Sequence, residues 1–507
     1  MDAGKTRVRT GMNSSTVVPS GRKRRPSDAA ARSRGKRVGP DRARRVPGSA
    51  IVRPLEPTAK WSARRWAVEL LVRSEGGTEF GSALLAQVSP DLSSADRALV
   101  TELFYGVLRH RSALDWRLAA CSQRPLARLA APVRATLRLA AYQLLFLSRI
   151  PTPAAVHTSV ELVKSLGSPT DAGFVNAVLR ALDQRRDTLV VPDLLERPLD
   201  HLTAEYSHPV WLVRRWLKRF GLQRTLQLCR ADNAVPPTTL RVNTLVTTRE
   251  RVLDALREEG IDASPSMVSP CGVVMRSGSP TAPRAFAQGW YYVQDEAAQL
   301  VSLAVAPRPG ERILDACAAP GGKSIHLAEL MGDQGEIIAA DVDPGRLRLV
   351  AENCRRMAVT SVRPVLADMT SAADVKDLGK FDRILVDAPC SGLGVLRRHP
   401  EAKWHKTEAL IARYAATQRT ILERVSTLLK PGGVLVYSTC STEREENEGL
   451  VGAWALARRS WSRDDLRSVL PGSARTLITP EGYLSTLGNR WDMDHFFAAR
   501  FTNPGAA

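Results

Sequence analysis

Apolar residues recur at three- and four-residue spacing from Trp61 to about Leu189, which is the pattern of one buried helix face. The repeated positions are Trp66, Leu70 and Leu71; Leu99, Leu103 and Val107; Val133, Leu137, Ala141 and Leu144; Val156, Val160 and Val163; Val175, Val178 and Leu182. Prolines 151, 153 and 169 and Gly167 separate the later segments. Five or more amphipathic helices of this kind predict an all-α bundle over residues 58–195.

A different pattern begins at about residue 291, where short apolar runs of strand length alternate with helical segments. The runs cover residues 312–317, 336–343, 362–368, 381–390 and 433–441. This alternation predicts a doubly wound parallel sheet, and therefore an α/β, Rossmann-like domain over residues 291–507. Residues 495–501 read as a late edge strand.

The stretch between these blocks, residues 196–290, predicts a small α+β module. Its expected elements are a helix at 209–230, a strand at 239–245, a charged helix at 247–259 and a strand at 272–276. In the first helix, basic residues lie among tryptophans: Arg214, Arg215, Lys218 and Arg219 beside Trp211 and Trp216. That mixture suits RNA, which proteins bind through phosphate contacts and base stacking. Tryptophan at this spacing is as often a core residue, so both interpretations stand.

The length and the charge of the chain predict a basic tail and a polyanionic partner. A chain of 507 residues is long enough for about three folded units. The net charge is +20, of which residues 1–57 supply +11 without an aromatic residue or apolar periodicity. We expect residues 1–57 to be a disordered basic tail, serving either solubility or RNA tethering. The excess of positive charge favours nucleic acid as the partner over a membrane.

The seven cysteines are spaced at least 36 residues apart, so the Cys-x-x-Cys spacing of zinc and redox sites does not occur. We therefore expect no metal and a reducing compartment. Neither a membrane-spanning apolar stretch nor a secretory signal stands out. The sequence predicts a soluble, cytoplasmic monomer that does not bind membranes.

Two of these cysteines, Cys390 and Cys440, each follow an apolar strand. Ligands of open parallel sheets bind beyond the carboxyl ends of the strands. We therefore expect both thiols to face one site, and a pair of thiols in a site suggests covalent chemistry. A disulfide between them is the alternative, which a reducing compartment disfavours.

Residues 313–323 read as a strand, a tight glycine turn and the start of a helix. Glycine at such a turn lets the backbone approach a ligand closely. Position 317 is Cys where a Walker phosphate loop requires Gly, and the dinucleotide fingerprint Gly-x-Gly-x-x-Gly is absent, so ATP and NAD are not favoured. The candidate cofactor loop consists of Cys317, Ala318, Ala319, Pro320, Gly321, Gly322 and Lys323.

Two carboxylates follow the next strands and complete the expected cofactor site. Asp341 is placed to accept hydrogen bonds from ribose hydroxyls, and Asp368 is placed to meet an adenine edge. Ribose and adenine recognition without a phosphate loop fits S-adenosylmethionine. Alternatively, the two aspartates are only turn residues.

Together, Asp315-Ala-Cys-Ala-Ala-Pro-Gly-Gly-Lys323, Asp387-Ala-Pro-Cys-Ser391 and Ser438-Thr-Cys-Ser441 resemble motifs of the Sun/Nop family of RNA cytosine-5 methyltransferases. Residues 294–298 and 397–404 match as well. The helical block, with Gly106-Val-Leu-Arg109 and residues 174–180, resembles the NusB RNA-binding fold. That fusion is characteristic of the bacterial enzymes that methylate a cytosine of 16S ribosomal RNA, on bare RNA or on a small-subunit assembly intermediate.

The resemblance also implies roles for single residues. Cys440 would add to C6 of cytosine, and Cys390 would assist release of the methylated product. Asp387 would border both cofactor and base. Lys323 would lower a nearby thiol pKa or position the methionine end of the cofactor, unless it is a helix-surface lysine. Arg397, Arg398, His399 and Lys403 would place positive charge at the rim where RNA enters.

Two other functions remain open at this stage. A tRNA cytosine-5 methyltransferase would carry the same catalytic motifs. A NusB-like RNA-binding or ribosome assembly factor with an inactive methyltransferase domain belongs to a different class, and the intact thiols and carboxylates argue against it.

Overall fold

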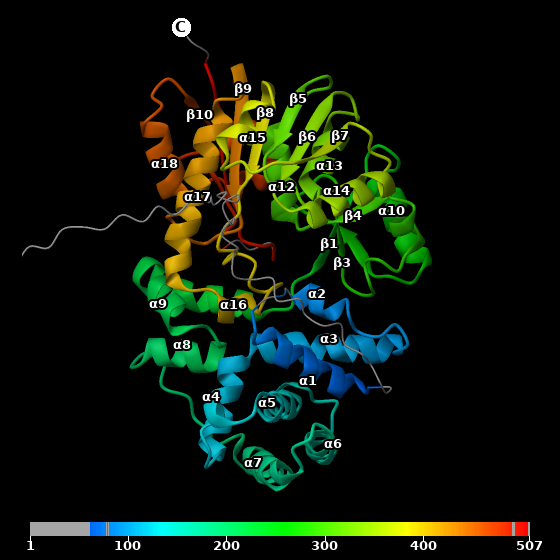
Figure 1. Ribbon diagram of the computed structural model, residues 1–507, viewed down its shortest axis with the longest axis vertical. Coiled ribbons are helices and arrows are strands. Elements are labelled where there is room, and N and C mark those ends of the chain that lie inside the picture. The colour runs from blue at the N-terminus through cyan, green and yellow to red at the C-terminus, as the bar shows by residue number, and fades with distance from the viewer. Residues whose placement is uncertain (1–60, 78, 80, 489–491, 505–507) are drawn as a thin grey trace, which may run out of the picture. The chain divides into compact units, whose positions relative to one another are not determined.

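The computed structural model describes residues 61–77, 79, 81–488 and 492–504 (Figure 1). The basic tail expected over residues 1–57 lies outside the described residues. No helix within the described part of the chain is both long and apolar enough to cross a membrane.

The N-terminal region is the predicted helical bundle. Its helices are α1 (Ala63–Ser74), α2 (Gly81–Leu85), α3 (Ser94–Arg109), α4 (Arg111–Cys121), α5 (Ala131–Phe146), α6 (Thr152–Ser165) and α7 (Ala172–Arg185). Helix α5 contacts α1, α3, α4, α6 and α7, so its apolar positions fill the centre of the bundle. Ser93 caps α3 by accepting a hydrogen bond from the Asp96 amide at 3.0 Å, and its hydroxyl donates to the Asp96 carboxylate.

The α+β module follows, and it extends past its expected C-terminal end. It contains α8 (Pro198–Tyr206), α9 (Val210–Asn233), β1 (Thr238–Val242), α10 (Arg249–Glu258), β2 (Ala263–Pro265), β3 (Gly272–Met275), α11 (Arg284–Ala287) and β4 (Tyr291–Val293). Its antiparallel sheet has the order β2-β3-β1-β4. Because β4 pairs with β1, this sheet extends past the expected boundary at residue 290. Helix α9 is broken at Gly221, whose φ of +73° is not helical.

The C-terminal region is the predicted α/β domain. Its elements are α12 (Glu296–Val305), β5 (Arg312–Asp315), α13 (Gly322–Leu330), β6 (Glu336–Asp341), α14 (Pro344–Arg356), β7 (Val362–Leu366), α15 (Ala372–Lys376), β8 (Phe381–Asp387), α16 (Ala402–His405), α17 (Glu408–Ser426), β9 (Leu429–Thr439), α18 (Glu448–Leu456), β10 (Ser462–Asp464), β11 (Leu484–Ser485) and β12 (Phe497–Thr502).

The order of the strands fixes where a ligand can enter. The main path of the sheet is β10-β12-β9-β8-β5-β6-β7, and β5 to β9 run parallel. The chain moves outward from β5 through β6 to β7 and then returns to β8 on the other side of β5. This reversal makes the crevice between β5 and β8 the switch point at which doubly wound sheets bind ligands.

Successive side chains of each strand point to opposite faces of the sheet, and both faces are buried. Ile313 packs in a core with residues of α12, α13 and α14, whereas its neighbour Leu314 packs with residues of α17 and α18. Buried on both sides, the parallel strands read as nearly continuous apolar runs in the sequence.

The prediction of an edge strand near residue 495 is wrong. Strand β12 lies between β9 and β10 and is antiparallel to both, and β11 also pairs with it. The short strand β10 forms that edge of the sheet. The apolar run showed that a strand exists here, but the neighbours of that strand depend on pairing between distant segments.

Candidate active site

The two thiols predicted to share a site lie side by side. Strands β8 and β9 are parallel neighbours, with Asp387 in register with Ser438, so both chains leave the sheet at the same end. Cys390 Sγ lies 3.4 Å from Cys440 Sγ, and both cysteines are free thiols, not a disulfide. The hydrogen bond with Cys440, followed by burial and by the charges of Cys440 and Glu446, raises the pKa of Cys390 well above its usual value. Cys390 therefore stays protonated at neutral pH.

A lysine and an aspartate form an ion pair beside these thiols. Lys323 Nζ donates to Asp387 Oδ2 at 2.6 Å, and Ser438 Oγ donates to Asp387 Oδ1 at 2.6 Å. Burial opposes the charge of Lys323, but Asp387 and Asp315 outweigh burial, so the pKa of Lys323 lies above its usual value. The side chain of Lys323 is only 12% exposed. The alternative of a helix-surface lysine is therefore wrong.

A cavity of about 170 Å³ opens at the switch point between β5 and β8. Its walls come from β4 and the segment after it, from the predicted loop, and from the ends of β5 and β8: Tyr292, Gln294, Ala298, Asp315, Cys317, Ala318, Ala319, Pro320, Gly322, Lys323 and Asp387. Burial, and then the carboxylates of Asp315, Asp387 and Asp341, raise the pKa of Cys317 well above its usual value, so this third thiol stays neutral.

Asp315 at the end of β5 carries a buried oxygen that lacks a partner. Ser324 Oγ donates to Asp315 Oδ2 at 2.7 Å, but Oδ1 has no hydrogen-bond partner among the described residues. Burial raises the pKa of Asp315 to about 7. A buried polar atom left unpaired in a binding cavity calls for a donor from a ligand. Asp315 belongs to the motif of the cofactor loop, but the sequence did not predict a role for it.

Gly321 is required by the backbone conformation of the loop, and Gly322 by packing. Gly321 has φ +101° at the start of α13, a conformation that favours glycine. A Cβ at Gly322 would lie 2.9 Å from the ring of Tyr292. Close approach of the backbone to a ligand was the expected reason for these glycines. The contact with Tyr292 is a second reason for Gly322, which also lines the cavity, so close approach to a ligand stays a prediction.

Asp341 is the last residue of β6, and Asp368 lies two residues beyond the end of β7. Asp341 is buried and accepts hydrogen bonds from the amides of Ala319 and Asp343, both at 3.1 Å. Asp368 accepts from the amide and the hydroxyl of Thr370, both at 2.7 Å, which is a turn contact. Neither residue is among the described residues that line the cavity between β5 and β8.

The prediction of an RNA-entry rim is wrong for Arg397 and Lys403, which are buried, whereas it stays a prediction for Arg398 and His399, which are partly exposed. Arg397 Nε donates to Asp494 Oδ1 at 2.7 Å, and Arg398 donates to both Asp494 and Asp295. Lys403 is only 1% exposed and donates to Asn233 Oδ1 at 2.7 Å. Distant acidic and amide partners hold Arg397 and Lys403 inside the molecule, and these partners cannot be read from the local sequence.

The same segment joins the α/β domain to the helical bundle. Trp404 Nε1 donates to the Leu108 carbonyl at 2.8 Å, and Arg109 Nη2 donates to the Arg397 carbonyl at 3.0 Å. Glu401 Oε1 accepts from the Gly81 amide at 2.9 Å. Residues 397–404 therefore serve as a structural joint between domains.

Helix α9 packs on the segment that follows Cys440. Trp216 is buried and its Nε1 donates to Glu443 at 3.2 Å, so for this tryptophan the core interpretation is correct. Arg215 forms ion pairs with Glu408, Glu443 and Glu445. Arg215 and Trp216 thus hold the segment that follows Cys440, whereas Arg214 and Lys218 are exposed.

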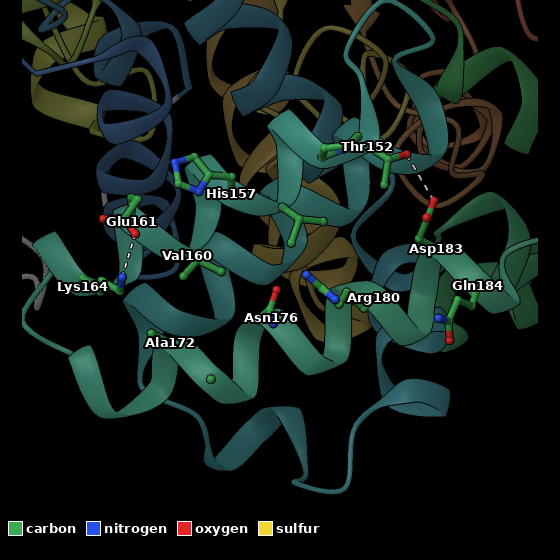
Figure 2. A pocket seen from close by; sticks show the side chains of 13 residues that line it. Thr152, His157, Val160, Glu161, Lys164, Ala172, Asn176, Arg180, Asp183 and Gln184 are labelled. Atoms are coloured by element: carbon green, nitrogen blue, oxygen red, sulfur yellow. Dashed lines mark hydrogen bonds and ion pairs between the residues drawn. The ribbon is translucent and has the colours of Figure 1, made fainter.

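A larger groove, of about 680 Å³, lies in the helical bundle between α6 and α7 (Figure 2). Some of its polar side chains already pair with one another: Lys164 Nζ with Glu161 at 2.7 Å, and Thr152 Oγ1 with Asp183 at 3.2 Å. The groove contains none of the predicted catalytic or cofactor residues.

Three family models match successive parts of the chain. The model of the 16S rRNA methyltransferase RsmB/F matches residues 302–502, the NusB family model matches residues 62–184, and a ferredoxin-like domain of RsmF/B-like methyltransferases matches residues 208–282. These matches confirm the predicted order of a NusB-like bundle, an α+β module and a methyltransferase domain.

Known proteins resemble the chain over most of its length. It is 36% identical over 449 residues to the probable ribosomal RNA small subunit methyltransferase B of Bacillus subtilis, covering 88% of this chain and 100% of that protein. It is 39% identical over 379 residues to ribosomal RNA small subunit methyltransferase B of Erwinia tasmaniensis, covering 73% of this chain and 84% of that protein. The crystal structure of PH0851 matches with a TM-score of 0.72 at 26% identity, covering 87% of this chain and 99% of that one. The chain therefore belongs to the family of ribosomal RNA small subunit methyltransferase B.

Proposed function

We propose that this protein transfers a methyl group from S-adenosylmethionine to C5 of a cytosine in 16S ribosomal RNA. The observation that carries the proposal is the pair of free thiols, Cys390 and Cys440, 3.4 Å apart beside the Lys323–Asp387 ion pair. Membership of the methyltransferase B family supports small-subunit ribosomal RNA as the substrate.

The residues of the switch-point cavity suit the methionine end of S-adenosylmethionine. Asp315 Oδ1, which lacks a partner among the described residues, would accept hydrogen bonds from the amino group, and Lys323 would attract the carboxylate. Asp341 and Asp368 would bind the ribose and the adenine. When bound, S-adenosylmethionine supplies an electrophilic methyl group on a positively charged sulfur.

Cys440 would be the nucleophile. Cytosine C5 reacts poorly with an electrophile until a nucleophile adds at C6 and raises the electron density at C5. The thiolate of Cys440 would form a bond to C6, after which C5 would take the methyl group, and the sulfur of the cofactor would leave as a neutral thioether. A base then removes the C5 proton, and the bond between C6 and Cys440 breaks to restore the aromatic ring.

Cys390 and Asp387 would act on either side of this adduct. Because Cys390 stays protonated and lies 3.4 Å from Cys440, its thiol can donate a hydrogen bond to the departing sulfur and so assist release. Asp387, held by Lys323 and Ser438, would hydrogen-bond the cytosine edge. The target base would have to leave its stack to reach this site.

Bisulfite sequencing of 16S ribosomal RNA tests this function. A strain that lacks the gene should lose one 5-methylcytosine, and the wild-type gene should restore it, whereas Cys440→Ala should not. Loss of a tRNA methylcytosine instead would identify the tRNA enzyme. No loss from either RNA would favour a binding factor with an inactive methyltransferase domain.

A further inference from the structure

A buried glutamate lies directly behind the two thiols and takes no part in the chemistry outlined above. Glu446 is 0% exposed, although it belongs to the strongly charged stretch Glu443-Arg-Glu-Glu-Asn-Glu448. Burying a carboxylate is costly unless hydrogen bonds compensate for the lost water. The hydrogen-bond partners of Glu446 therefore indicate its role in the structure.

All the donors to Glu446 come from the surroundings of the two cysteines. Glu446 Oε2 accepts from the hydroxyls of Ser391, at 2.5 Å, and Ser441. Glu446 Oε1 accepts from the Ser391 amide at 2.8 Å and from Gln418 Nε2 at 3.0 Å. Ser391 follows Cys390 and Ser441 follows Cys440, so one carboxylate joins the residues adjacent to both thiols.

The contacts hold the Cys390 segment from both sides. Gln418 Nε2 also donates to the carbonyl of Pro389, at 2.9 Å, so the residues before and after Cys390 are both fixed. Residues 388–401 form no helix or strand, so this segment has no ladder of backbone hydrogen bonds of its own.

Cys440 has further supports. It directly follows β9, which is paired on both sides, by β8 and by β12. Asn447 Nδ2 donates to the Ser441 carbonyl at 2.8 Å, and the Gly394 amide donates to the Cys440 carbonyl at 2.9 Å. Loss of Glu446 should therefore displace Cys390 more than Cys440.

We propose that Glu446 is a positioning residue that sets the distance and orientation between Cys390 and Cys440, and through them the release of the methylated product. This inference rests on the proposed function, because it assigns product release to Cys390. None of the four donors to the Glu446 carboxylate carries a charge, so the carboxylate fixes geometry by hydrogen bonding and not by ion pairing.

The first test compares Glu446→Ala with Glu446→Gln in the full-length protein, with a 16S ribosomal RNA transcript and labelled S-adenosylmethionine. In Glu446→Ala, turnover should fall on the order of 10- to 100-fold, because small displacements of reacting groups are costly. A covalent RNA–protein band that survives denaturation should accumulate, while the affinity for S-adenosylmethionine stays within about twofold of wild type.

Glu446→Gln should restore most of the turnover. The side-chain oxygen of the glutamine can accept from the Ser391 amide and from Gln418. Its side-chain NH2 group can donate to the two serine hydroxyls, which rotate freely. Glu448→Ala is the matched control, because Glu448 is 37% exposed and pairs only at the surface with Arg219. A Gln variant as impaired as the Ala variant, or an Ala variant with normal turnover, would overturn the proposal.

The two serines give a second test that does not require Glu446→Ala to fold. Ser391→Ala loosens the segment of Cys390 and should accumulate the covalent band. Ser441→Ala loosens the segment of Cys440 and should slow formation of that band. Identical behaviour of the two variants would contradict a positioning role. Absence of methyl transfer by the wild-type protein would instead refute the proposed function itself.

Discussion

Cys390 Sγ and Cys440 Sγ lie 3.4 Å apart, although 50 residues separate them in the chain. Parallel pairing of β8 with β9 brings them together, because both strands end at the same edge of the sheet. The two thiols differ in their support. Cys440 directly follows a strand paired on both sides, whereas Cys390 lies in a loop held by side chains.

The first prediction separates the roles of these thiols. Cys440→Ala should abolish methyl transfer from labelled S-adenosylmethionine and form no covalent RNA adduct, because the nucleophile is gone. Cys390→Ala should trap the adduct, visible as a band that survives denaturation. An adduct in Cys440→Ala would reverse the two assignments.

The second prediction concerns the pH dependence of cofactor binding. The pKa of Asp315 is raised to about 7, so its carboxylate becomes charged only as the pH rises through that value. Affinity for S-adenosylmethionine should increase between pH 6 and pH 8 in calorimetric titrations. Asp315→Asn should weaken binding and flatten this dependence. The control is Asp382→Asn, at the opposite end of β8, which should keep the pH dependence of the wild-type protein. If the affinity of Asp315→Asn for S-adenosylmethionine still rose with pH, Asp315 would not have this role.

The third prediction concerns stability and Lys403. Burial lowers the pKa of Lys403 to about 8, so between pH 8 and 10.5 the unfolded chain binds the proton that the folded protein has lost. Lys403 should therefore make the free energy of unfolding rise with pH in this window, by an amount on the order of 3 kcal/mol.

Urea unfolding of Lys403→Met at several pH values should lack this rise. Lys430→Met, which removes a lysine whose side chain is 42% exposed, is the control and should retain it. If the free energy of unfolding rose equally with pH in the Lys403→Met and wild-type proteins, this lysine would not be buried in solution.

The fourth prediction tests the correction to the expected RNA rim. Arg397→Ala leaves the buried carboxylate of Asp494 without one of its partners and should lower the free energy of unfolding by about 3–5 kcal/mol. The dependence of RNA affinity on salt should not change, because Arg397 touches no phosphate. A smaller salt slope for the charge-removing variant Arg397→Gln, with normal stability, would restore the rim interpretation.

The fifth prediction concerns the basic tail. Deletion of residues 1–57 removes +11 of the charge and should weaken RNA binding mainly at low salt. Filter binding at several salt concentrations measures the slope. An unchanged slope would leave solubility as the function of this segment.

The sequence by itself determined the domain order, most helices and strands, and the two strand-end thiols. Each of these depends on local spacing: a period near 3.6 for the bundle, and continuous apolar runs for strands buried on both faces. The position of Asp387 and Cys390 after one such run, and of Cys440 after another, followed from the same local pattern.

Only the tertiary structure decided which neighbours these residues have. The place of β12 inside the sheet, the burial of Arg397 and Lys403, and the contact of Glu446 with both thiol segments all depend on partners far away in the chain. A charged residue looks the same in the sequence whether it faces water or a buried counterpart. Its role was therefore settled by long-range packing and hydrogen bonding, which local pattern does not encode.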